Sequence, residues 1–261
     1  MTLTVSDNDR PAESLHWYTQ RGAAAYQVTG KNGKLRPTTL RDARTMDLVP
    51  SVTTILTLLS KPGLNAWMQQ QVLYAALTLP RLPAEKEDDW IGRIITDSKA
   101  QGRVASEEGT DIHASIQSFY EGAPTGKHEA HVKGCSEALL THFGKQHWIA
   151  EKSFAYDGFG GKCDLHTKDF VVDIKTKEFS DPKKIKAYDE HLLQLAAYRV
   201  GLGIPSARCA NVFVSRSHPG LTAVFEWSEE DLARGWEMFS ILLKFWQLKN
   251  KFNVNYRTKP E

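Results

Sequence analysis

Two short segments of the chain place carboxylates where they could share a metal ion. Along residues 170–176 side chains alternate between the faces of an expected strand, so Asp173 and Lys175 point to one side. Asp164 belongs to the preceding expected strand, and the short connection favours a hairpin that brings Asp164 beside Asp173. Two carboxylates at close quarters repel each other unless a positive charge lies between them. A divalent cation would supply that charge.

Magnesium is the ion we expect at this place, with Mn²⁺ as a substitute. Mg²⁺ takes oxygen ligands and usually keeps several waters beside one or two protein carboxylates. Lys175, next to such an ion, could orient a water nucleophile or stabilise negative charge on a phosphate. This is the chemistry of phosphodiester hydrolysis. The alternative, a simple salt bridge between Asp173 and Lys175 on a sheet face, is the commoner case for one isolated triplet.

The elements that must position these residues follow one another as helices and then as an α/β part. A turn at Lys31-Asn32-Gly33 predicts a hairpin. Helical patterns with caps and stops cover residues 51–56, stopped by Pro62-Gly63, then 64–77, 85–120 with breaks near Gly102 and Gly109, and 129–146. Strand patterns then cover residues 148–156, 162–167, 170–176, 208–215 and 221–227. Two later helices are expected, one over residues 189–202 and one that begins at residue 228.

This order predicts an α/β fold in which a central mixed β-sheet is flanked by helices and preceded by a helical N-terminal region. We expect a tail and a hairpin over residues 1–50, the part before His16 being a loose terminus. A single domain is expected over residues 51–261, with a helical part at 51–147 and a catalytic α/β core at 148–261.

Composition excludes several classes of protein. The 261 residues are 41% apolar and 25% charged, which is ordinary for a globular chain. The 33 Lys and Arg against 31 Asp and Glu exclude histone-like binding to any polyanion. Three scattered cysteines exclude a disulfide framework, and no leader or bilayer-length apolar stretch is visible. We therefore expect a protein of a reducing cytoplasm with no membrane partner.

Five short motifs in order resemble the signature of the PD-(D/E)XK nucleases, specifically the RecB-like and phage exonuclease branch. Together with Glu151 they run from about Ser51 to Tyr198, which is more than half of the chain. The motifs are Pro50-Ser51-Val52-Thr53-Thr54-Ile55-Leu56, Gly109-Thr110-Asp111-Ile112-His113, Gly161-Lys162-Cys163-Asp164, Asp173-Ile174-Lys175 and Gln194-Leu195-Ala196-Ala197-Tyr198. Each motif alone is weak, whereas their order and spacing make a strong signal.

The resemblance implies a restriction-endonuclease-like core and a role for each matched residue. Asp164 and Asp173 would bind the metal, with His113 and the backbone carbonyl of Ile174 as further ligands. Lys175 would be the catalytic lysine, and Glu151 would position water or a second metal. Gln194 and Tyr198 would lie over the site. The alternatives are a core histidine at His113 and a plain helix–sheet contact at Gln194 and Tyr198.

Two further groups of residues are expected to contact DNA. Lysines that follow the catalytic strand are suited to the phosphate backbone, namely Lys177, Lys183, Lys184 and Lys186. Hydroxyls at a helix start with nearby arginines would suit a terminal 5′-phosphate, namely Ser51, Thr53, Thr54, Arg41 and Arg44. The alternative for these lysines is that they are ordinary solvated surface residues.

Other metal and phosphate sites are not expected. The glycine-rich turn at 158–162 lacks the phosphate-loop spacing and is a hairpin turn. His128, His131 and Cys135 lack a fourth ligand for zinc. Related nucleases with an iron–sulfur cluster use four cysteines, and this chain has three, so no cluster is expected.

The leading hypothesis is a Mg²⁺-dependent exonuclease that degrades DNA from duplex ends in phage-type recombination. The alternatives are a structure-specific or flap endonuclease with the same core, and a catalytically inactive DNA-binding accessory protein of recombination. DNA is the expected partner, and a single-strand annealing protein and further copies of the chain are additional candidate partners.

Overall fold

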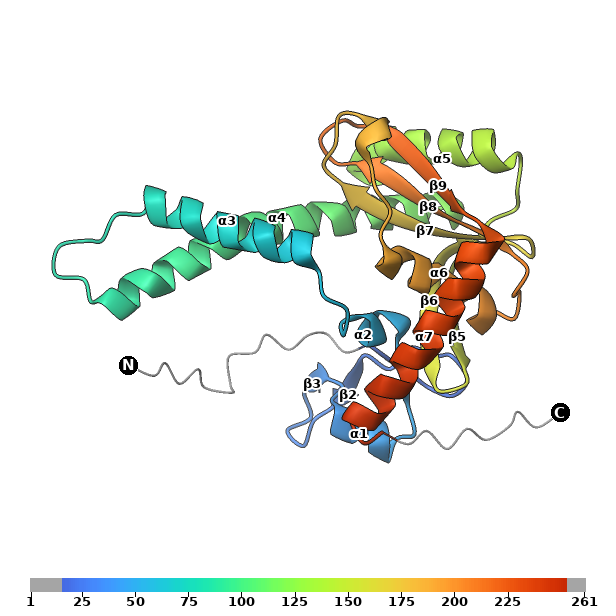
Figure 1. Ribbon diagram of the computed structural model, residues 1–261, viewed down its shortest axis with the longest axis horizontal. Coiled ribbons are helices and arrows are strands. Elements are labelled where there is room, and N and C mark those ends of the chain that lie inside the picture. The colour runs from blue at the N-terminus through green and yellow to red at the C-terminus, as the bar shows by residue number, and fades with distance from the viewer. Residues whose placement is uncertain (1–15, 253–261) are drawn as a thin grey trace.

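The computed structural model describes residues 16–252, and its centre is a five-stranded mixed sheet (Figure 1). The strand order is β5-β6-β7-β8-β9. The parallel pair is β7 with β8, and the other neighbours are antiparallel. The strands are β5 (Ile149–Tyr156), β6 (Phe159–His166), β7 (Phe170–Lys177), β8 (Arg208–Ser215) and β9 (Thr222–Trp227). All five predicted strands are present, but the hairpin turn expected at residues 158–162 is wrong. The turn is Asp157-Gly158 alone, and residues 159–162 already belong to β6, because their backbone pairs with β5.

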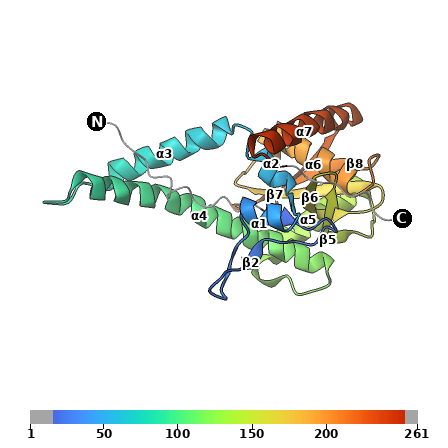
Figure 2. The ribbon, with the colours of Figure 1, turned by 90° about the horizontal axis from the view of Figure 1, so that it is seen from below.

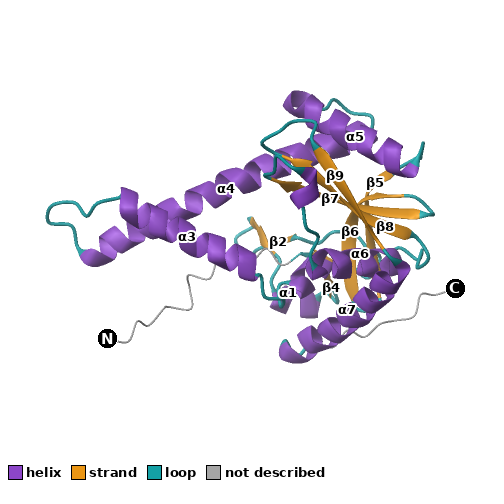
Figure 3. Cartoon of the chain, turned by 45° about the horizontal axis from the view of Figure 1, so that its top comes forward, coloured by secondary structure: helices purple, strands orange, loops and turns teal. Residues whose placement is uncertain are grey.

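Helices cover both faces of this sheet (Figure 3). One face packs on α5 (Glu129–Phe143) and on the C-terminal half of α4 (Glu87–Tyr120). The other face packs on α6 (Asp189–Gly201) and, behind it, α7 (Glu229–Lys249). Alternation along β7 explains both contacts, because Val172 and Ile174 join the first core and Val171 joins the second. The predicted α/β class with a central mixed sheet flanked by helices is confirmed.

The N-terminal elements pack beside α7 below the sheet (Figure 1). They are β1 (Trp17–Tyr18), β2 (Gln27–Thr29), β3 (Leu35–Pro37), α1 (Leu40–Thr45), β4 (Val49–Pro50) and α2 (Val52–Leu56). The predicted hairpin is β2 paired with β3, and Ser51 caps α2 by accepting from the Thr54 N–H. Trp17 is fully buried against Trp246. The expected loose terminus before residue 16 lies outside the described residues, and the boundary at residue 50 stays a prediction.

Two helices, α3 (Pro62–Thr78) and the N-terminal half of α4, project from the sheet as an arm (Figure 2). Two expectations are wrong here. Pro62 does not stop a helix but occupies the first turn of α3, where the missing N–H costs nothing. The breaks expected near Gly102 and Gly109 are absent, because α4 runs unbroken for 34 residues. Gly109 instead permits close packing, since a Cβ atom there would lie 2.5 Å from Thr176 Oγ1.

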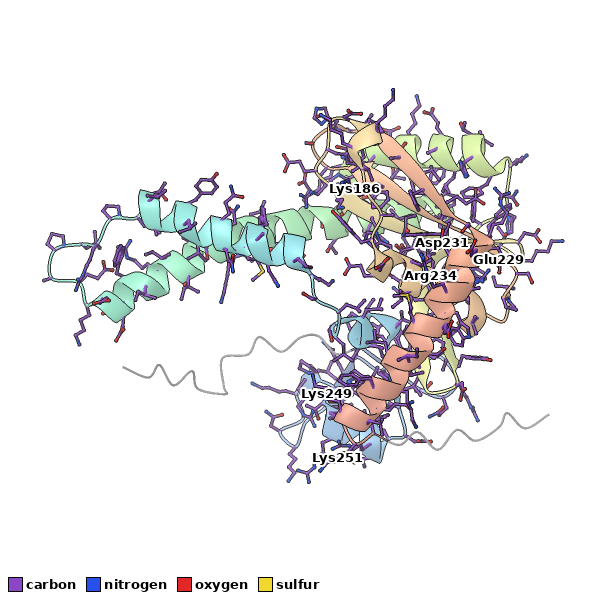
Figure 4. All side chains as sticks on the ribbon, in the orientation of Figure 1. Lys186, Glu229, Asp231, Arg234, Lys249 and Lys251 are labelled. Carbon is purple, nitrogen blue, oxygen red and sulfur yellow. The ribbon has the colours of Figure 1, made fainter. Side chains whose placement is uncertain are left out.

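The final helix begins as its sequence predicts. Ser228 Oγ accepts from the Asp231 N–H, and acidic side chains occupy the first turn of α7 whereas Lys249 lies in the last (Figure 4). These charges complement the helix dipole at both ends. Two short 3₁₀ turns, Gly126–His128 and Pro182–Lys184, complete the described elements.

Over residues 16–252, none of the helices combines the length and the apolar character that a membrane crossing requires.

Candidate active site

Three potential metal ligands meet where β6 and β7 part. The imidazole of His113 on α4 lies 3.0 Å from Asp164 Oδ2, and Glu151 on β5 completes a group whose ligand atoms all lie within 4.8 Å of one another. Within residues 16–252 this is the one group of three or more His, Cys, Asp or Glu side chains close enough to hold a metal ion. The expected proximity of His113, Glu151 and Asp164 is therefore present.

The backbone explains why Asp164 turns into this group. The ladder between β6 and β7 pairs Leu165 with Val172 and then opens. The Ile174 N–H donates to Asp164 Oδ2 over 2.7 Å, so the side chain takes the place of a strand partner. Whether the carbonyl of Ile174 binds metal stays a prediction.

Glu151 has an unusual backbone conformation for its residue type. Its φ is +53°, a region that non-glycine residues seldom adopt. It lies between the ladder pairs Ala150–Leu165 and Lys152–Cys163, and its carboxylate contacts the ammonium of Lys162. Strain of this kind is concentrated at functional sites, where surrounding structure holds it in place.

A second group forms on the α6 side of β7. Asp173 is almost wholly buried, and Lys175 Nζ lies 3.0 Å from Asp173 Oδ1. Gln194 Nε2 donates to Asp173 Oδ1 over 2.8 Å and to Tyr198 Oη over 3.0 Å. Asn211 Nδ2 donates to Asp173 Oδ2 over 2.8 Å. Gln194 and Tyr198 thus share one helix face beside the carboxylate, as their spacing predicted.

Sequence reasoning missed Asn211, although a signal for it was present. Asn211 is fully buried on β8, between apolar neighbours, and its side-chain oxygen accepts from Trp227 Nε1 over 2.9 Å. A buried amide on an apolar strand requires a polar partner, and here that partner is Asp173.

The structure therefore distributes the expected ligands over two neighbouring groups. Asp164 belongs with His113 and Glu151, whereas both oxygens of Asp173 accept hydrogen bonds from Lys175, Gln194 and Asn211. That Asp164 and Asp173 share one cation stays a prediction.

Burial and neighbouring charges shift the pKa values in opposite directions. Burial is the main cause that raises the pKa of Asp173 to about 6, and the charge of Asp164 adds to it. Burial would lower the pKa of His113, but the charge and hydrogen bond of Asp164 outweigh it and raise that pKa to about 9. Burial alone would raise the pKa of Asp164, but the charge and hydrogen bond of His113, the charge of Lys175 and the Ile174 N–H together lower it. Both shifts favour the charged forms of His113 and Asp164, whose side chains lie 3.0 Å apart.

A cleft of about 570 Å³ opens over the first group. Besides the three potential ligands it is lined by Lys162, Thr176 and Arg216, which come from β6, β7 and the end of β8. Sequence reasoning did not single out Thr176 or Arg216, because their approach depends on how the strands and α4 assemble. Cations and potential metal ligands therefore share one opening.

The residues expected to contact DNA lie in different surroundings. Lys177 is half-buried, with Nζ 4.5 Å from the centre of the Tyr188 ring. Lys183, Lys184 and Lys186 are exposed on the segment before α6, where Figure 4 labels Lys186. Their contact with DNA stays a prediction.

The residues expected to hold a 5′-phosphate are partly engaged within the protein. Ser51 and Thr54 are buried and hydrogen-bond to each other through their hydroxyls over 2.8 Å. Arg41, Arg44 and Thr53 are exposed, and Arg44 also donates to the carbonyl of Asn250. The phosphate pocket stays a prediction, and Arg41, Arg44 and Thr53 are its accessible members.

The three cysteines are buried in separate elements, α5, β6 and β8. Burial raises the pKa of Cys135 to about 12, so that thiol is not a ready metal ligand.

No family model and no curated protein matches the sequence. Among solved structures, an alkaline exonuclease from Laribacter hongkongensis matches at 12% identity over 77% of this chain and 89% of that chain, with a TM-score of 0.40. The protein SSO0001 matches at 17% identity over 68% of this chain and 85% of that chain, with a TM-score of 0.28.

Proposed function

We propose that this chain is a divalent-metal-dependent deoxyribonuclease that hydrolyses phosphodiester bonds from the ends of duplex DNA. One observation carries the proposal. His113, Glu151 and Asp164 converge in a cleft that Lys162 and Arg216 also line. Carboxylates attract a divalent cation and the two basic side chains attract phosphate, so the cleft is suited to a substrate that brings both together.

The ligand set suits a hard or borderline divalent ion. Two carboxylates favour Mg²⁺ or Mn²⁺, and the imidazole of His113 moves the preference toward Mn²⁺. When bound, such an ion supplies neutralisation of phosphate charge and a water of lowered pKa. His113, Glu151 and Asp164 would hold it. We expect Mn²⁺ to bind more tightly than Mg²⁺ and Mg²⁺ to be the ion used.

Lys175 is the group that would act on the phosphate. Burial lowers its pKa, but the charges of Asp173 and Asp164 raise it more, so the net pKa is raised and the ammonium stays charged. Gln194 and Asp173 hold this ammonium on the strand, and about 29% of the Lys175 side chain is exposed. A fixed positive group beside the scissile bond would stabilise the charge that develops on the phosphate.

The finer parts of the proposal are the biological setting and the partners. We propose action on free DNA ends in phage-type recombination within a cytoplasm, together with a single-strand annealing protein. There are two competing functions: a flap or other structure-specific endonuclease, and an inactive accessory protein. Cleavage of closed circular duplex would indicate the endonuclease, and absence of any cleavage would indicate the accessory protein.

The test is cleavage of end-labelled linear duplex by the intact chain, with and without Mg²⁺. We expect metal-dependent release of nucleotides, abolished by Asp164→Asn, which removes a charged ligand of the group formed with His113 and Glu151, with much of the DNA affinity retained, because affinity depends largely on other phosphate contacts. Asp169→Asn, an exposed carboxylate in the turn between β6 and β7, is the matched control and should cleave normally. Undiminished cleavage by Asp164→Asn would contradict the assignment.

A further inference from the structure

A cavity of about 680 Å³ lies where the start of α3, the start of α6 and the end of β7 meet, and we call it the α3–α6 cavity. Its volume falls within the roughly 300–1,000 Å³ of sites that hold drug-sized ligands. None of its lining residues lines the cleft over the candidate metal ligands, so it is a separate opening. Its lining includes Leu59, Lys61, Leu64, Lys177, Tyr188 and Glu190.

The α3–α6 cavity adjoins Lys175. Side chains alternate along β7, so Lys177 lies on the same face as Lys175, roughly 7 Å further along the strand. Burial is the main cause that lowers the pKa of His191, and the charges of Lys175, Lys177 and Lys61 lower it further, so the three cations lie around one buried residue. Each base of DNA is joined to its phosphate through a single sugar. A strand whose phosphate contacts Lys175 would therefore bring a neighbouring base to this cavity.

An aromatic ring is held in place at the cavity and stays open to solvent. Tyr188 is 51% exposed, and Lys177 Nζ lies 4.5 Å from the centre of its ring. The Tyr188 N–H donates to His191 Nδ1 over 3.2 Å, and the two ring centres are 5.7 Å apart. The cation and the imidazole thus support the tyrosine while half of its surface remains accessible. Proteins that bind single-stranded nucleic acid stack unpaired bases on aromatic rings placed beside cations.

The charges of the lining balance one another. It carries two cations, Lys61 and Lys177, and two carboxylates, Asp189 and Glu190. Lys61 Nζ lies 3.0 Å from Glu190 Oε2, so one of each is already paired. A balanced lining does not select a phosphate. A base is uncharged, has apolar faces for stacking, and carries amino groups that can donate to an exposed carboxylate such as Asp189. The part of a nucleotide that fits the cavity is therefore its base.

We propose that the α3–α6 cavity binds an unpaired nucleobase of the DNA strand, next to the phosphate held at Lys175, with the base stacked on Tyr188. This inference rests on the proposed nuclease function, because that function places a phosphate at Lys175. It adds a single-stranded segment of the substrate as the ligand and Tyr188 as the residue that holds it.

Binding of single strands without metal tests the site, because no cleavage then competes. Fluorescence anisotropy compares a labelled oligothymidylate with an abasic strand of the same length, which has the same phosphates and no bases. We expect the parent to bind the thymidylate strand more tightly by roughly 5- to 150-fold, the range for stacking of one base. Tyr188→Ala should lose this preference. Tyr188→Phe should keep it, since stacking needs the ring and not the hydroxyl.

Tyr74 of α3 supplies the matched control, because it is 54% exposed and does not line the cavity. Tyr74→Ala should bind both strands as the parent does. Equal binding of the two strands by the parent, or equal losses from Tyr188→Ala and Tyr74→Ala, would overturn the proposal.

Photo-cross-linking gives a second measurement that needs no variant. A strand that carries 5-iodouracil, irradiated in complex with the parent chain, should become joined to Tyr188, because the excited base reacts with the aromatic side chain on which it stacks. Cross-links confined to aromatic residues outside the cavity would contradict the proposal.

The base site and the nuclease function can fail separately. If linear duplex is not cleaved with metal but the preference for bases still depends on Tyr188, the nuclease function fails and the base site stands. If linear duplex is cleaved and Tyr188→Ala leaves the preference for bases unchanged, the base site fails and the nuclease function stands.

Discussion

At the scale of single residues, Asp173 and Lys175 form an ion pair with each other within the protein. Asp173 is buried with donors on both oxygens, and Lys175 supplies the one full positive charge among them. The salt bridge that the sequence offered as an alternative is therefore present. It does not exclude catalysis, because a held ammonium is also a preorganised one.

Lys175→Ala separates these two roles. Loss of a preorganised positive group aimed at developing charge should lower the cleavage rate by about 100-fold or more, by analogy with loss of an oxyanion donor. DNA affinity should change little. Single-turnover rates and binding isotherms measure the two effects, and urea unfolding checks that the fold persists. A rate within a few-fold of the parent would leave Lys175 as a salt-bridge partner only.

His191 predicts how stability depends on pH. Burial, followed by the charge of Lys175, lowers the pKa of His191 from 6.5 to about 4 in the folded chain. The unfolded chain therefore binds more protons between these values, and the fold loses stability as pH falls below 6.5. At pH 5 we expect the free energy of unfolding to be lower by about 2 kcal/mol from this group. In His191→Gln the loss of unfolding free energy between pH 6.5 and pH 5, measured by urea unfolding, should be smaller by that amount. An unchanged pH dependence of the unfolding free energy would contradict a lowered pKa at His191.

At the scale of elements, α4 connects the arm to the candidate active site. The C-terminal half of α4 places His113 beside Asp164, and the N-terminal half of α4 forms part of the arm. The helix reaches β7 closely because Gly109 has no side chain where Thr176 Oγ1 lies. One residue thus sets how near His113 comes to the other potential ligands.

Gly109→Ala should push α4 away from β7. A Cβ atom 2.5 Å from Thr176 Oγ1 forces a shift that we expect to cost about 1–3 kcal/mol of stability and to weaken Mn²⁺ binding, because His113 lies one turn further along. Calorimetric titration and thermal unfolding measure both quantities. Thr176→Ala in the same chain should restore part of the loss.

A second glycine of the same helix supplies the control. A Cβ atom at Gly92 would meet nothing within 4 Å, so Gly92→Ala should stabilise α4 by about 0.5–1 kcal/mol and leave metal binding unchanged. Equal effects of the two substitutions would show that helix propensity, rather than the contact with Thr176, explains the result at Gly109.

At the scale of the whole molecule, the question is whether the protein needs a free DNA end. If Arg41, Arg44 and the helix start at Ser51 hold a terminal 5′-phosphate, linear duplex should be degraded and closed circles should survive. Phosphorylated ends should be cut faster than hydroxyl ends, since an occupied pocket fixes the scissile bond relative to the metal. Arg41→Ala with Arg44→Ala should erase this preference and leave the metal dependence unchanged.

Two outcomes of the same assay would change the assignment. Rapid nicking of closed circles would favour the endonuclease. Equal rates on both kinds of 5′ end would remove the proposed pocket, consistent with the Ser51 hydroxyl already accepting from the Thr54 N–H as the cap of α2 and donating to the Thr54 hydroxyl.

The sequence by itself determined the elements whose signals are local. The alternation of Asp173 and Lys175 with apolar residues predicted β7, and the Ser228 cap predicted the start of α7, because both depend on residues a few positions apart. The helix face shared by Gln194 and Tyr198 follows from the same kind of spacing.

Only the tertiary structure decided which of these residues meet. Asp164 lies with His113 and Glu151 because the ladder between β6 and β7 opens beyond Leu165, and no local pattern marks that opening. Gly109 allows α4 to pack closely against Thr176 of β7, which lies far along the chain. From the local sequence alone, the same glycine predicted a break in the helix. Positions distant in sequence come together through packing of whole elements, and that packing depends on every residue of the interface at once.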